Sequence, residues 1–71
     1  MELSEVIKKV RLGLYLSQGG LARELHVGFT SMNRWENNHT KPNKIARHAL
    51  IKLCKNKYVN NELIELLLKA K

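Results

Sequence analysis

Apolar residues recur along this chain at the spacing of a helix. In the first stretch they lie three and four positions apart, at Leu3, Val6, Ile7, Val10 and Leu14. This spacing gathers them on one helical face and predicts a first helix over about residues 2–14. No stretch alternates apolar and polar residues as a half-buried strand does. The pattern therefore predicts an all-α domain.

Capping residues divide the rest of the chain into four further helices. Asn37-Asn38 is the expected end of the third helix, because Asn tolerates the left-handed conformation that closes helices. Pro42 marks the loop before the fourth helix, since the residue before a proline avoids the helical region. Short loops then predict a compact five-helix bundle. The N-cap candidates are Ser17, Gly28, Asn43 and Asn60.

Length and charge limit the possible functions. Seventy-one residues form one small domain with a single core, which excludes a two-domain enzyme. Thirteen Lys and Arg residues oppose six Glu, so the net charge is +7. An excess of this size on a small domain indicates a polyanionic partner, either nucleic acid or an anionic membrane. The basic residues are scattered and do not form one amphipathic face, which favours nucleic acid.

Residues with catalytic or metal-binding chemistry are sparse. Cys54 is the single cysteine and lies in an apolar-periodic stretch, so a buried thiol is expected and an internal disulfide is excluded. The three histidines have no zinc-ligand spacing relative to it. The sequence lacks a nucleophile–base–acid set and a phosphate-cradling loop. We therefore expect no enzyme activity, no cofactor and no metal. Without a signal peptide or a long apolar span, we expect a cytoplasmic protein.

Residues 17–36 have the spacing of two helices that pack across a tight turn. Leu21 and Leu25 share one face of the first of these helices, and Met32 and Trp35 share the inward face of the second. With Val10 and Leu50 added, these residues are the expected core. Arg34 then points outward, where its fork could pair with a guanine edge. The outward face of this helix comprises Phe29, Thr30, Asn33 and Arg34.

Residues 6–54 resemble the lambda-repressor-like (Cro/repressor-type) helix-turn-helix DNA-binding family. Each matching segment is weak alone, but together they stand at the spacing typical of the family. The resemblance implies a five-helix fold whose third helix, about residues 28–37, enters the DNA major groove. The matching segments are Leu16-Ser17-Gln18, Leu21-Ala22, Leu25, Val27, Asn33-Arg34-Trp35-Glu36-Asn37 and Thr40-Lys41-Pro42.

The resemblance also implies a role for individual residues. Base reading would fall to Phe29, Thr30 and Arg34, with Asn33 adjacent. Arg11 and Glu36 would form an internal salt bridge between the first and third helices and would not read bases. The residues that would bind DNA phosphates are Ser17, Gln18, Asn37, Thr40, Lys41 and Lys44.

The sequence departs from the family pattern near both turns. Gly19-Gly20 replaces polar or acidic residues, which costs the second helix about 1 kcal/mol per glycine relative to alanine. His26 occupies a turn position where glycine is usual, so a positive φ is expected there. Tyr15 stands where a helix-ending glycine is common, so either the first helix ends at Gly13 or Tyr15 is strained. Phe29 would touch thymine methyl groups or pack against the protein.

The C-terminal segment is apolar on more than one helical face. Residues 1–57 are interpreted as the helix-turn-helix domain, and residues 58–71 as an apolar helix of the same compact unit, from about Asn61 to Lys69. The surplus leucines predict a homodimer on DNA, with half-sites about 34–36 Å apart. We expect a small prokaryotic or phage transcriptional repressor. Three alternatives stay open: an antitoxin-like protein whose C-terminal helix holds a partner protein, the DNA-binding domain of a longer protein, and a pure protein-interaction module.

Overall fold

The computed structural model describes residues 2–57 and 60–69 of the chain. Within these residues the chain forms five α-helices and no strand, which confirms the predicted all-α fold of five helices. The boundary predicted between residues 57 and 58 adjoins residues 58–59, which lie outside the described ranges. The helices are α1 (Leu3–Gly13), α2 (Gln18–Glu24), α3 (Phe29–Glu36), α4 (Lys44–Asn56) and α5 (Asn61–Lys69).

Side-chain caps begin three of the helices where the sequence predicts them. Ser17 Oγ accepts the N–H of Gly20 at 2.9 Å at the start of α2. Asn43 Oδ1 accepts the N–H of Ala46 at 2.8 Å before α4. Asn60 Oδ1 accepts the N–H of residue 62 at 2.8 Å before α5. Each bond satisfies one of the backbone donors that a helix start leaves without an intrahelical partner.

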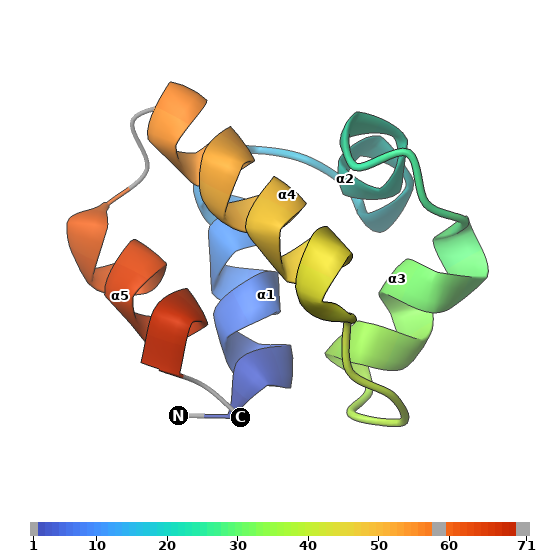
Figure 1. Cartoon of the computed structure of the whole chain (residues 1–71). Helices are drawn as coiled ribbons and strands as arrows, with labels where there is room; N and C mark the ends of the chain where they lie inside the picture. Colours follow the sequence, from blue (N-terminus) through green and yellow to red (C-terminus); the bar gives the residue numbers. More distant parts are fainter. Residues whose placement is uncertain (1, 58–59, 70–71) are drawn as a thin grey trace.

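One hydrophobic core joins all five helices. Helix α1 packs against α3 and α5, α2 packs against α3, and α4 packs against α5, so α3 and α5 lie on opposite sides of α1 (Figure 1). All six core residues expected from the sequence are buried, which confirms the inward register of α3. The core comprises Leu3, Val6, Ile7, Val10, Leu21, Ala22, Leu25, Met32, Trp35, Leu50, Cys54, Ile64 and Leu67.

Most of the apolar surface of α5 is used inside this monomer. Ile64 and Leu67 are buried, and Leu63 and Leu66 are half-buried against the core. Leu68 is the exposed member of the run, with 62% of its surface open to solvent. Leucines on several sides of α5 therefore pack into the core. Of the second apolar face predicted from the sequence, only Leu68 is exposed among the described residues.

Three helices close on a left-handed residue that carries a side chain. The φ angles are 58° at Tyr15, 57° at His26 and 61° at Asn38. In each case the next N–H bonds to the carbonyl five residues earlier, from residues 16, 27 and 39 to residues 11, 22 and 34, at 3.1, 2.9 and 2.9 Å. This is the Schellman closure, which usually carries glycine. Helix α1 ends at Gly13, and Tyr15 also has a left-handed backbone. The sequence predicted these two features as alternatives, and the structure has both.

Replacing His26 by glycine should therefore stabilise the protein. A left-handed conformation costs a residue with a Cβ about 1–2 kcal/mol, and glycine adopts it freely. We expect His26→Gly to raise the free energy of unfolding by about 1 kcal/mol, measured by urea denaturation. His26→Ala is the control, because alanine keeps a Cβ at the same φ and should give no gain. Equal stability of the two variants would show that the φ of residue 26 stores no strain.

Candidate nucleic-acid interface

The outward face of α3 carries the four side chains that the sequence places there. Phe29, Thr30 and Arg34 are exposed, and Asn33 is half-buried. On the opposite side of the helix the core holds Met32 and Trp35. Helical spacing aligns residues 29 and 33 in one row and residues 30 and 34 in the next. The face therefore offers an aromatic ring, a hydroxyl, an amide and a guanidinium together.

A partly buried ion pair joins α3 to α1. Arg11 Nε donates to Glu36 Oε2 at 2.7 Å, and Arg11 Nη2 donates to Glu36 Oε1 at 3.1 Å. The Glu36 side chain is only 1% exposed and that of Arg11 is 15% exposed. Arg11 Nη1 also donates to the carbonyl of Leu16 at 3.1 Å, which ties the pair to the loop before α2. A two-point pair of this kind fixes orientation as well as distance.

A chain of amide hydrogen bonds extends from this ion pair to the outer face of α3. Gln18 Nε2 donates to Glu36 Oε1 at 3.2 Å, and Gln18 Oε1 accepts from Asn33 Nδ2 at 3.2 Å. Asn33 Oδ1 in turn accepts from Asn37 Nδ2 at 3.1 Å. An amide group that donates and accepts at the same time has its oxygen and nitrogen positions assigned by the network. Three helices thus set the orientation of one row of amides.

These bonds give Gln18 and Asn33 an internal role beside the one expected from the sequence. Each amide nitrogen uses one N–H in the chain and has a second one, which leaves a donor for an outside acceptor. The contact between the Gln18 and Asn33 side chains was not predicted from the sequence. They are fifteen residues apart on different helices, so no periodic signal links them. Only the contact between Asn33 and Asn37 could be predicted from the sequence, because residues four apart are neighbours on a helix.

Hydrogen-bonding and cationic groups border α3 at both ends. Ser17 is exposed at the start of α2, next to the amide row. Asn37, Thr40 and Lys41 are exposed in the segment that follows α3, and Lys44 is exposed at the start of α4. All six residues expected to bind phosphate thus belong to the start of α2 or to the segment from the end of α3 to the start of α4. Two of the six carry positive charge.

Other parts of the molecule carry less organised chemistry. The free thiol of Cys54 is buried, and desolvation raises its pKa from 9.0 to about 11, so it stays protonated at neutral pH. In the described ranges, no group of three or more His, Cys or Glu residues could hold a metal ion. No described helix is long and apolar enough to span a membrane.

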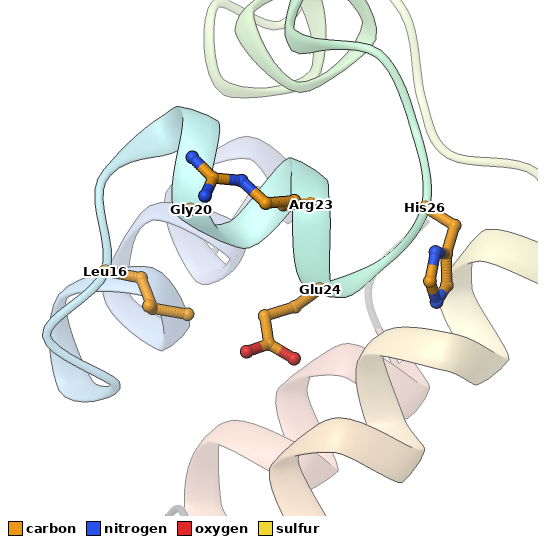
Figure 2. A pocket seen from close by; sticks show the side chains of 5 residues that line it. All are labelled: Leu16, Gly20, Arg23, Glu24 and His26. Carbon is orange, nitrogen blue, oxygen red and sulfur yellow. The ribbon is translucent and has the colours of Figure 1, made fainter.

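A shallow pocket lies on the outer side of α2, away from the face of α3 described above. Its walls are Leu16, Gly20, Arg23, Glu24 and His26. Figure 2 shows that Arg23 and Glu24 extend to different sides of α2, while His26 projects from the turn after it. The charged groups do not converge on a common point, so the pocket lacks the arrangement of polar groups expected of a ligand-binding site.

Comparisons with protein families, with curated proteins and with solved structures give no match to this chain.

Proposed function

We propose that this protein binds double-stranded DNA in a sequence-specific way, as a domain of the lambda-repressor-like helix-turn-helix type. In this proposal α3 lies in the major groove, and the protein acts as a small prokaryotic or phage transcriptional regulator in the cytoplasm. The observation that carries the proposal is the outward face of α3. Its hydrogen-bonding side chains stand on a helix whose other side is locked into the core, with Trp35 only 7% exposed.

The internal network supports this role because a reader of base edges must be rigid. A side chain that selects one base needs its donor atoms held in place before the DNA arrives, or ordering them would cost affinity. The Arg11–Glu36 pair and the amides of Gln18 and Asn33 hold α2 and α3 in one arrangement. The base readers we propose are Phe29, Thr30, Asn33 and Arg34.

The positive charge of the protein also supports DNA binding with α3 in the major groove. The net charge of +7 attracts the phosphate backbone and gives sequence-independent affinity. Lys41 and Lys44 are exposed beside α3, where they would contact a strand that borders the groove. Neutral donors to phosphates would come from Ser17, Gln18, Asn37 and Thr40. These phosphate contacts would fix the position of α3 along the groove. The side chains on its outer face would then select the bases.

We also propose that two copies bind DNA as a two-fold dimer. A recognition helix of eight residues reads only a few base pairs, and a second copy would double the site. Leu68 is an exposed apolar side chain on α5 that could take part in such a contact. The dimer extends the proposed function and is tested by the symmetry of the DNA site that the protein selects.

Substitution should separate base reading from phosphate binding. Arg34→Ala should weaken binding to a selected duplex by about 1–3 kcal/mol and relax preference at one position per half-site. Lys41→Ala should weaken binding to all sequences about equally and lower the salt slope by about 0.9 for the lost phosphate contact. The measurement is the affinity for the selected and a scrambled duplex across a salt series.

Lys57→Ala is the matched control for charge. Lys57 is exposed at the C-cap of α4, at the opposite end of that helix from Lys44, so its loss removes the same charge away from α3. It should leave the salt slope nearly unchanged. If Arg34→Ala weakened binding to both duplexes by the same factor, α3 would not be the reader, and the proposed orientation would be wrong.

A further inference from the structure

One exposed apolar group stands on the otherwise polar face of α3. Phe29 is the first residue of the helix, and 56% of its surface is open to solvent. Its neighbours on that face are a hydroxyl, an amide and a guanidinium. A large aromatic ring kept in water forgoes the stabilisation that burial would give. Its place among hydrogen-bonding groups therefore calls for an apolar partner outside this chain.

The start of α2 leaves one side of this ring uncovered. A Cβ built on Gly19 would lie 4.0 Å from Phe29 Cδ2, which is ordinary van der Waals contact. The ring thus stands beside a position of α2 that has no side chain. Any larger residue at position 19 would extend toward the ring and compete with an outside partner. Gly19 therefore keeps this side of Phe29 open, although it weakens α2 as a helix.

The major groove offers this ring only one kind of apolar group. Base edges there present hydrogen-bond donors and acceptors, and the C5-methyl group of thymine is the exception. We propose that Phe29 reads thymine by packing on its C5-methyl group. This inference rests on the proposed function, because it requires α3 to lie in the major groove. It goes beyond the proposed function by naming the base that Phe29 reads.

The position of the ring on the helix also predicts where this thymine lies. Phe29 and Arg34 are five residues apart, which is about 7.5 Å along the helix axis. Stacked base pairs are about 3.4 Å apart, so the two side chains reach positions about two base pairs apart when the helix follows the groove. Each half-site should then contain a thymine about two base pairs from the guanine that Arg34 contacts.

Replacing single thymines by uracil tests this contact, because uracil differs from thymine only in lacking the methyl group. For each thymine of the selected duplex, the dissociation constant is measured for the thymine and uracil forms. One thymine per half-site should show about a fourfold loss per methyl group, the value expected for one buried methyl. Phe29→Ala should abolish this difference while Arg34 still discriminates its guanine. At the same position, exchanging the T·A pair for C·G should weaken binding, and 5-methylcytosine should restore about fourfold.

Leu12→Ala is the control, because it removes an apolar side chain that is 58% exposed on α1, outside the proposed DNA and dimer contacts. It should leave the ratio of thymine to uracil affinity unchanged. A duplex that binds in an Arg34-dependent way but shows no uracil effect would overturn the Phe29 assignment and leave the proposed function standing. An undiminished uracil effect in Phe29→Ala would overturn it equally. Failure to bind any duplex at low salt would overturn both proposals.

Discussion

Replacing Trp35 by alanine should lower the free energy of unfolding by about 3–5 kcal/mol, the usual cost of removing a buried large aromatic side chain. Trp35 lies on the inward side of α3, and Met32 beside it on that side is completely buried. A domain of this length has a total stability of roughly 4–10 kcal/mol. The variant should therefore lose a large part of its stability, as measured by thermal and urea denaturation followed by circular dichroism.

Phe29→Ala is the matched control within the same helix. It also removes an aromatic ring, but this ring is more than half exposed and contributes little to the core. The free energy of unfolding should change by only about 0.5 kcal/mol, as for most surface substitutions. Equal losses in Phe29→Ala and Trp35→Ala would contradict the register of α3, and with it the assignment of every residue on its outer face.

Breaking the Arg11–Glu36 pair should cost about 3–5 kcal/mol when one partner is removed. Glu36→Gln or Arg11→Met would each leave the other side chain away from water without its charge partner. The double variant should lose less than the sum of the two single losses, because no uncompensated charge then remains. The measurement is a double-mutant cycle on the free energy of unfolding, with urea denaturation of all four proteins.

The size of the coupling decides between a buried and a solvated pair. A coupling energy of about 1.5–3 kcal/mol would agree with the 1% exposure of Glu36. A coupling near zero would describe an exposed ion pair of little consequence. The Glu36 variants should also loosen the amide row through Gln18, which depends on the same carboxylate. Weaker DNA discrimination by Glu36→Gln than by an equally destabilised variant elsewhere would reveal this second role.

The helices were predictable because local signals and tertiary packing agree along this chain. Apolar residues at spacings of three and four mark the buried face of each helix, and Ser17, Asn43 and Asn60 mark helix starts with short-range hydrogen bonds. The same spacing places Arg34 outward once Trp35 points inward. Which side chains line the candidate interface therefore follows from the sequence alone.

The remaining features depend on distances between helices, which the sequence does not encode locally. The amides of Gln18 and Asn33 meet only because α2 and α3 pack at one particular angle. The leucines of α5 suggested a second apolar face, but Leu63 and Leu66 reach the core from its flanks. Whether a leucine is surplus depends on how many sides of a helix its neighbours cover, and only the packed structure shows this.

The most direct test of DNA recognition is a selection of bound duplexes from random DNA at one stated salt concentration, with affinities then measured for the best site and a scrambled one. We expect one enriched sequence, two-fold symmetric, with half-site centres about 10 base pairs apart. The protein should bind it at least about 10³-fold more tightly than the scrambled duplex. Recovery of no common sequence, with equal affinity for both duplexes, would contradict sequence-specific binding by this domain.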